Sequence, residues 1–159
     1  MSMERVPMTP QGYQQLQEEL KRLKSEERPR IIRAIEEARD HGDLSENAEY
    51  DAAKESQAQL DRRIGEIEDK LARAEVIRPE DTQGDRVVFG ARVLITDLNN
   101  DRQLSYRLVG EDEADRSQNK ISVRSPLARA MIGKVVGDMF VVQTPGGERE
   151  YVVDEIHFD

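Results

Sequence analysis

Two apolar stripes on either side of a glycine constrain the fold more than any other feature. The stripe before Gly42 consists of Tyr13, Leu16, Leu20, Leu23, Ile31, Ile35 and Ala38. The stripe after it consists of Leu60, Ile64, Ile67, Leu71 and Ala74. Steps of three and four residues are typical of helices that pack along a narrow seam. Gly42 can end the first helix because glycine accepts a left-handed backbone. The sequence therefore predicts an antiparallel helical hairpin.

Sequence signals also predict where the two helices begin and bend. Thr9 and Pro10 suit the N-cap and first position of a helix that runs to about residue 41. Pro29 removes one backbone donor, so we expect a bend or local break at residues 26–30, or two separate helices that meet there. Asp43 is expected to cap the second helix, with Glu46 at its third position reaching back. Two carboxylates would then lie at the hairpin tip.

A turn centred near Gly42 also predicts which residues face each other across the seam. The expected pairs are Leu20 with Ile64, Leu23 with Leu60, Tyr13 with Leu71, Ile31 with Ala53 and Ile32 with Ala52. Glu27 would face Gln57 in a polar layer, which can fix the register of a coiled coil. Near the tip the seam is expected to narrow to Ala34, Ala38, Ala48, Ala52 and Ala53.

The pattern changes after Ile77, where a polar segment with Pro and Gly predicts a linker over residues 79–85. Short β-branched runs follow, and the expected strands are Val87–Phe89, Arg92–Asp97, Gln103–Val109, Ile121–Val123, Met139–Gln143 and Glu148–His157. Ser125 and Pro126 should begin a short helix that ends at Gly133. The predicted class is α+β: a coiled-coil hairpin over residues 1–78, with residues 1–8 as a short tail, and a small antiparallel β domain over 86–159.

Composition narrows the functional classes. The chain of 159 residues is 36% charged and has no Trp, which suits a long coiled coil. Residues 1–78 carry a net charge of −4 and residues 79–159 one of −5. Neither half is a basic DNA-binding module of the usual kind. The absence of Cys excludes disulfides and thiolate metal sites. Because no apolar run is long enough to span a membrane, we expect a cytoplasmic protein with no membrane partner.

Few residues suggest chemistry. His41 and His157 do not form a cluster, and residues 144–147 are too short for a phosphate loop and read as a hairpin turn. Asp43 and Glu46 remain. Carboxylate oxygens suit Mg²⁺, although two of them make an incomplete site. The same pair is also explained as a helix cap favoured by the helix dipole, and the two interpretations are compatible.

The sequence of residues 41–50, HGDLSENAEY, and the following residues 51–55 resemble the hairpin tip of the bacterial Gre transcript cleavage factors. Residues 8–13 resemble the opening of that family. Further matching stretches are 27–32, 109–115, 121–123, 125–130, 132–134 and 144–147. The resemblance covers essentially the whole chain in order.

This resemblance implies a coiled-coil hairpin followed by a domain of FKBP-like fold. That domain would dock at the rim of the RNA polymerase secondary channel, and the hairpin would pass down the channel towards the 3′ end of the nascent RNA. Asp43 and Glu46 would help to hold the second Mg²⁺ of the polymerase, an ion that the free protein does not bind. The factor would then be a monomer that stimulates the polymerase rather than an enzyme alone.

The resemblance also implies roles for other residues. Basic side chains of the hairpin would approach RNA, and the candidates are Arg33, Arg39 and His41, with Arg28, Arg30, Arg62 and Arg63. Each is equally explained as a solvated helix charge. The loop 122–128 would contact the polymerase through Arg124, Ser125 and Pro126, although Arg124 stands where Asn or Asp is expected.

Two other functional classes fit parts of the sequence. A homologue that enters the same channel but inhibits the polymerase would share this architecture, and extra acids at the tip would favour it. A module that acts without polymerase, such as a coiled-coil dimer or a prolyl isomerase, is the second. The C-terminal half has few aromatic residues for a proline pocket: Phe89, Tyr106, Phe140, Tyr151 and Phe158.

Overall fold

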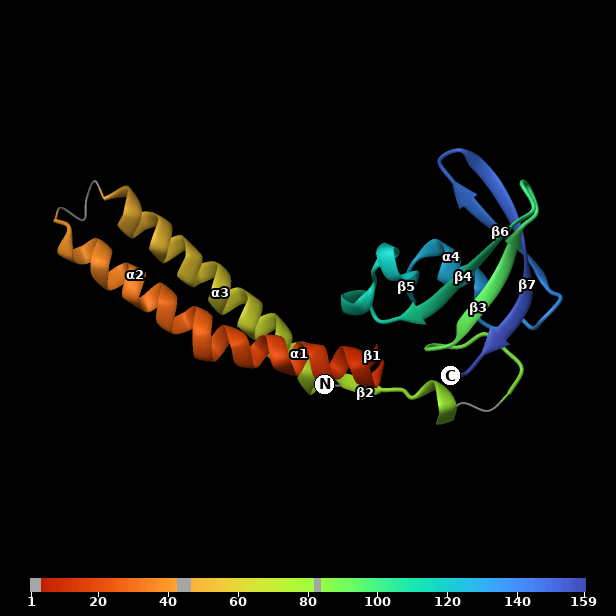
Figure 1. Cartoon of the computed structure of the whole chain (residues 1–159), viewed down its shortest axis with the longest axis horizontal. Coiled ribbons are helices and arrows are strands. Elements are labelled where there is room, and N and C mark those ends of the chain that lie inside the picture. The colour runs from red at the N-terminus through yellow and green to blue at the C-terminus, as the bar shows by residue number, and fades with distance from the viewer. Residues whose placement is uncertain (1–3, 43–46, 82–83) are drawn as a thin grey trace. The chain divides into compact units, whose positions relative to one another are not determined.

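A computed structural model describes residues 4–42, 47–81 and 84–159. The described chain divides into two compact units (Figure 1). The first unit contains residues 13–74, and the second contains residues 4–12 together with residues 75–159. The short N-terminal segment therefore belongs to the second unit, although its helix continues into the first.

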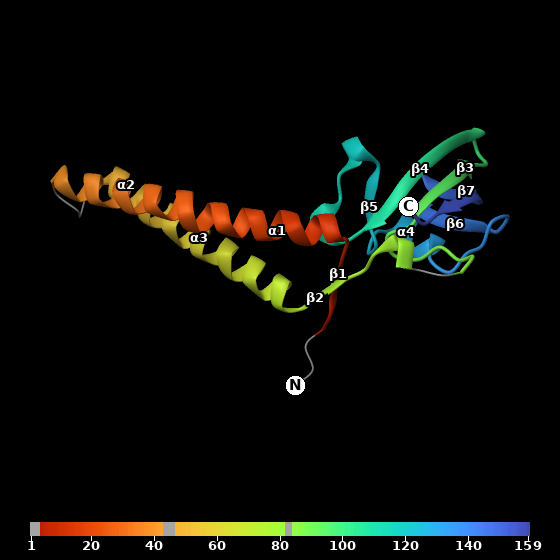
Figure 2. The same ribbon diagram turned by 60° about the horizontal axis from the view of Figure 1, so that its bottom comes forward.

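The first unit is a helical hairpin. Helix α1 (Pro10–Arg22), the π-helical turn η1 (Leu23–Glu27) and helix α2 (Arg28–Asp40) follow one another without interruption. Helix α3 (Ala48–Ala72) returns alongside them (Figures 1 and 2). Arg63 bridges the two arms, because its Nη2 lies 2.9 Å from Glu19 Oε2. The predicted intramolecular hairpin is confirmed.

The irregularity expected at Pro29 appears as a π-helical turn. The N–H of Arg28 donates to the carbonyl of Leu23, five residues earlier, and Pro29 follows within the first turn of α2. Proline has no N–H and its ring crowds the carbonyl four residues before it. A wider turn relieves that crowding while the helix continues. The alternative of two separate helices is wrong.

The apolar seam is narrower than the sequence suggested. Its buried side chains are Leu16, Leu23, Ile35, Ala38, Ala53, Leu60, Ile64 and Ile67. Ile32 is 41% exposed and Ala52 is exposed, so their predicted pairing is wrong. Successive helical side chains point about 100° apart, so Ile31 and Ile32 cannot both face one seam. Ala34 and Ala48 are also exposed, which leaves two of the five predicted tip alanines buried.

Gly65 offers a test of helix propensity in this hairpin. It lies inside α3, and a Cβ built on it would meet no atom within 4 Å. Alanine favours a helix interior over glycine by about 0.8–1.0 kcal/mol. We expect Gly65→Ala to raise the free energy of unfolding of the hairpin by up to that amount, measured by urea denaturation followed by circular dichroism. Gly42→Ala should instead destabilise it, since Gly42 has φ +123°.

The second unit is built on a five-stranded sheet with the order β5-β4-β3-β7-β6. Its strands are β3 (Arg92–Asp97), β4 (Arg102–Val109), β5 (Lys120–Ser122), β6 (Met139–Thr144) and β7 (Gly147–His157). Strand β5 runs parallel to β4, so the sheet is mixed and the purely antiparallel prediction is wrong. The chain between them turns twice, at the 3-10 turns η4 (Glu111–Glu113) and η5 (Arg116–Gln118), which restores its direction.

Helix α4 (Pro126–Met131) covers the core of this sheet, and it begins where the sequence predicted. The largest fully buried side chains of the unit are Val87, Val93, Ile95, Leu108, Val109, Met131 and Val153. Val87 was expected in a strand over residues 87–89, and this is wrong. Only an isolated bridge joins Arg86 to Val135, and the chain turns at Gly90, where φ is +87°.

The segment expected to be an N-terminal tail contributes a strand. Strand β1 (Val6–Met8) pairs with β2 (Ala74–Val76), and the N–H of Ile77 donates to the Met8 carbonyl over 2.8 Å. The 3-10 turn η3 (Pro79–Asp81) follows, within the segment expected to be a linker. Because Met8 is buried, residues 6–8 are part of the folded structure of the second unit.

Candidate functional site

The hairpin tip contains the two carboxylates that the sequence singled out. Asp43 and Glu46 lie outside the described residues. On one side of them α2 ends at Asp40, and Gly42 adopts the left-handed backbone expected for a helix end. On the other side α3 begins at Ala48.

Asn47 joins the ends of the two helices. Its Oδ1 accepts from the N–H of Tyr50 at 3.1 Å, which makes it the N-cap of α3. Its Nδ2 donates to the carbonyl of Ala38 on α2 at 2.6 Å. The predicted cap at Asp43, with Glu46 at the third helical position, is therefore wrong. Asparagine is as good an N-cap as aspartate, and its amide can donate as well as accept, so it serves both helices.

The Asn47 clamp can be tested separately from the carboxylates. Asn47→Ala removes the cap of α3 and the bond to α2, so we expect the hairpin to lose about 1–2 kcal/mol of unfolding free energy. Asn47→Asp keeps the acceptor for Tyr50 but not the donor for Ala38, and it should fall between wild type and Asn47→Ala. Chemical denaturation measures both. An Asn47→Ala protein as stable as wild type would show that the clamp contributes nothing.

The basic residues predicted to approach RNA differ in their surroundings. Among the described residues, neither Arg33 nor Arg39 makes an ion pair, and both are exposed. His41 lies 3.4 Å from Glu49, measured from Nδ1 to Oε2. The candidates further down pair with hairpin acids: Arg28 with Asp61, Arg30 with Glu27, Arg62 with Glu55 and Arg63 with Glu19. Within the described part of the hairpin, Arg33 and Arg39 are therefore the two of these arginine candidates that have no ion-pair partner.

The donor chemistry of the tip limits what it can do with a metal. Within the described parts of the chain, no three Asp, Glu, His or Cys side chains are grouped to hold an ion. Asp43 and Glu46 add two hard-oxygen ligands, whereas Mg²⁺ requires six. The residues fit Mg²⁺ only as part of a site whose other ligands come from elsewhere.

The predicted contact loop is built around the start of α4. Ser125 caps this helix, because its Oγ accepts from the N–H of Ala128 at 3.2 Å, and Pro126 occupies the first helical position. Arg124 is half exposed, and its guanidinium lies 3.5 Å from Glu4 and 3.8 Å from Glu111. The loop is therefore held from both sides.

Ser125 and Pro126 form one edge of a hollow of about 810 Å³. Apolar and aromatic side chains from four strands and α4 line it: Tyr106, Ile121, Leu127, Val142 and Tyr151. Tyr151 stacks on Phe140, with ring centroids 5.4 Å apart, and burial raises the pKa of its hydroxyl. Sequence reasoning missed this hollow. Strand pairing sets Tyr106 opposite Val93 and Tyr151 opposite Asp97, so both tyrosines lie on the same face of the sheet and line one hollow.

Two stretches of the sequence match models of known protein families. Residues 6–76 match the family model described as transcription elongation factor, N-terminal, and residues 81–158 match transcription elongation factor, GreA/GreB, C-term. The chain belongs to the GreA/GreB family of transcription elongation factors. Both Gre models together cover nearly the whole chain in order.

Individual relatives agree with the Gre assignment. Transcription elongation factor GreA of Anaeromyxobacter sp. (strain K) is 56% identical over 98% of this chain and 94% of its own length. GreA of Hyphomonas neptunium is 57% identical over 97% and 98% of the two chains. Among solved structures, the GreA factor homolog 1 (Gfh1) of Thermus thermophilus is 31% identical, with 97% of this chain and 99% of that chain covered and a TM-score of 0.44.

No helix among the described residues of this Gre chain is both long enough and apolar enough to cross a membrane.

Proposed function

We propose that this protein binds bacterial RNA polymerase, inserts its hairpin into the secondary channel and stimulates cleavage of backtracked nascent RNA. Membership of the GreA/GreB family over both units is the observation that carries this proposal. The hairpin confirmed in the structure supports it, because Asp43 and Glu46 belong to the seven residues, 41–47, that join its two helices in the sequence. The cytoplasm is the compartment in which this function would operate.

The tip carboxylates are proposed to complete the metal site of the polymerase. When bound, Mg²⁺ supplies charge neutralisation and an activated water for phosphoryl transfer. Asp43 and Glu46 add two oxygen ligands and negative charge next to that site. Because the pair is incomplete alone, the free factor holds no ion and has no hydrolytic activity of its own. Arg33 and Arg39 are proposed to steer the phosphates of the RNA 3′ end towards the tip.

Docking is assigned to the second unit. The hollow beside Ser125 and Pro126 combines an apolar lining with a polar rim, the usual composition of a protein-binding site. The factor is proposed to act as a monomer. The apolar stripes of its two helices pack against each other within one chain, so they do not need a second chain as a partner.

A cleavage assay on a stalled elongation complex tests the proposal. Radiolabelled RNA in a backtracked complex should be shortened from its 3′ end when the protein and Mg²⁺ are added, and elongation should then resume. An inhibitory homologue would instead slow elongation and leave the RNA uncut. If the protein does not bind polymerase at all, the alternative of a module that acts without polymerase is favoured. A prolyl isomerase assay would then test that alternative.

A further inference from the structure

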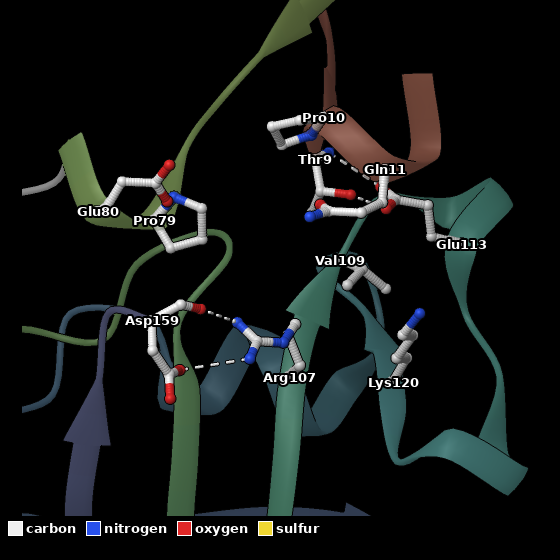
Figure 3. Close-up of a pocket in the computed structure, with 10 residues that line it drawn as sticks. All are labelled: Thr9, Pro10, Gln11, Pro79, Glu80, Arg107, Val109, Glu113, Lys120 and Asp159. Atoms are coloured by element: carbon white, nitrogen blue, oxygen red, sulfur yellow. Dashed lines mark hydrogen bonds and ion pairs between the residues drawn. The ribbon is translucent and has the colours of Figure 1, made fainter. Parts of the chain in front are cut away.

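Two stretches that carry the family resemblance share a contact that belongs neither to the tip nor to the docking loop. They are residues 8–13 and residues 109–115, separated by about a hundred positions in the chain. The structure brings them together inside the second unit, at the side of a cavity of about 310 Å³ (Figure 3).

Glu113 is the centre of this contact. One carboxylate oxygen accepts from the backbone N–H of Thr9 at 3.0 Å and from the N–H of Gly110 at 3.2 Å. The other accepts from the hydroxyl of Thr9. Figure 3 shows the carboxylate directed at Thr9. Thr9 is only 4% exposed, so these hydrogen bonds are shielded from water and costly to leave unmade.

Thr9 is also the residue that begins α1. Its Oγ1 accepts from the N–H of Gly12 at 3.1 Å, the hydrogen bond of a helix N-cap. One hydroxyl therefore accepts from the first turn of α1 and donates to Glu113. The start of the helix is tied to a carboxylate of the sheet unit.

Two glycines give Glu113 the space it occupies. A Cβ on Gly12 would fall 2.1 Å from Glu113 Cδ, and a Cβ on Gly110 would fall 2.6 Å from the Pro7 carbonyl oxygen. Any side chain at position 12 would therefore push the carboxylate away from Thr9. Glycine is otherwise a poor choice inside a helix, which indicates that the close approach is the reason for it.

The contact lies within the second unit, close in sequence to a position where the chain passes into the first. The chain crosses at residues 12–13 and again at residues 74–75. Strands β1 and β2 pair next to the second of these positions, and Thr9 bonds to Glu113 next to the first. Helix α1 continues from residue 10 to residue 22 without a break, so whatever fixes its first turn constrains the hairpin arm that follows.

We propose that Glu113 is a positioning residue, which locks the first turn of α1 onto the docking unit so that a docked factor presents its tip to the polymerase active centre. This inference rests on the proposed function. Stiff coupling raises the effective concentration of a tethered group at its target. Loosening the coupling should leave docking intact and lower the rate of the tip-dependent step, because small misplacements of a reacting group are costly.

Three variants open the contact in different ways, and a fourth preserves it. Glu113→Gln removes the charge, and Thr9→Val removes the hydroxyl while keeping the shape. Gly12→Ala displaces the carboxylate while improving helix propensity, so it separates loss of the lock from loss of helix stability. Thr9→Ser keeps the hydroxyl and should behave as wild type.

Matched controls are available. Glu80 lines the same cavity and is exposed, so Glu80→Gln removes an equal charge without touching Thr9. Gly65→Ala gives the same gain in helix propensity as Gly12→Ala with nothing displaced. Neither should alter the coupling.

The first measurement needs no polymerase. The chain has no Cys, so two introduced cysteines, Ala58→Cys and Arg129→Cys, can be spin-labelled without side reactions. Pulsed electron–electron double resonance then measures the distance between a label in each unit. We expect the distance distribution to broaden in Glu113→Gln, Thr9→Val and Gly12→Ala, and to match wild type in Thr9→Ser and both controls. Unchanged distributions in both Glu113→Gln and Gly12→Ala would overturn the lock, whatever their thermal stability.

The second measurement is cleavage as a function of factor concentration. The lock variants should reach a plateau rate about tenfold below wild type, with a half-saturating concentration within about twofold of wild type. Broadened distances with a wild-type plateau would overturn the positioning role. If instead the wild-type protein stimulates no cleavage, the proposed function fails while the distance measurement still decides the lock.

Discussion

Replacing Asp43 with Asn is expected to lower the plateau rate of RNA cleavage by about 100-fold or more. Loss of one preorganised charged or polar group at a reacting centre costs about 2.7–4 kcal/mol of transition-state stabilisation. The fold should be maintained, because the cap of α3 is Asn47 and this substitution leaves its hydrogen bonds in place. Glu46→Gln should behave in the same way. Quenched-flow cleavage of a defined backtracked complex measures both.

The concentration dependence separates metal holding from docking. The half-saturating concentration of both variants should stay near wild type, since docking is assigned to the other unit. Raising Mg²⁺ should partly restore cleavage, because a weakened site refills by mass action. Glu37→Gln is the matched control, an exposed carboxylate of α2 outside the tip. Wild-type cleavage by both tip variants would mean that the tip carboxylates have no catalytic role.

The helical hairpin was predictable because its signal is periodic and long. Apolar residues recur at steps of three or four positions on both sides of the turn, as in Leu16–Leu23 and Leu60–Ile67. A glycine marks the turn between the two runs. The periodic pattern did not decide which of two neighbouring apolar residues faces the seam, nor where the second helix begins. Ile31 and Ile32 are equally apolar, and only the phase of the helix decides which one faces the seam. Asp and Asn are equally good N-cap residues, so local sequence does not distinguish Asp43 from Asn47, and the start of α3 was misplaced.

Features that depend on contacts distant in sequence were the ones missed. Strand β1 exists because residues 74–76 provide a partner for residues 6–8, and no local signal shows this. Strand β5 is parallel to β4 because two 3-10 turns lie between them, whereas the sequence gives only an acidic loop. The contact of Thr9 with Glu113 belongs to the same class. Both residues were in stretches noted for their resemblance, but only the fold assigns them to each other.

The hollow beside Ser125 and Pro126 was likewise predictable only in part. Ser125 and Pro126 were predicted from the resemblance, and the structure places both on the rim of a cavity. Its lining comes from β4, β5, β6, β7 and α4, so no single stretch of sequence describes it. Arg124, the residue that departs from the family pattern, is held by Glu4 and Glu111 and does not line this hollow. The departure is therefore compatible with docking through Ser125 and Pro126.

Pro126→Glu is expected to produce the complementary defect to the tip variants. Pro126 is exposed on the rim of the hollow and stands at the first position of α4. An acidic residue there is favoured by the helix dipole, so the fold should tolerate the change. The substitution nevertheless adds a charge at the edge of an apolar contact surface. Covering an unpaired carboxylate with a partner is costly, so we expect the half-saturating concentration to rise by at least about tenfold.

The plateau cleavage rate of Pro126→Glu should remain near wild type, because the tip residues are unchanged once the factor is bound. Val136→Glu provides the control, since Val136 is an exposed apolar residue of the same unit that does not line the hollow. Its half-saturating concentration should equal that of wild type. Equal shifts in both variants would indicate a general effect of negative charge on a protein that already carries −9, and equal wild-type behaviour would exclude the hollow as the docking surface. A shift in Pro126→Glu alone, combined with a plateau loss in Asp43→Asn alone, would assign binding and cleavage to separate units of one chain.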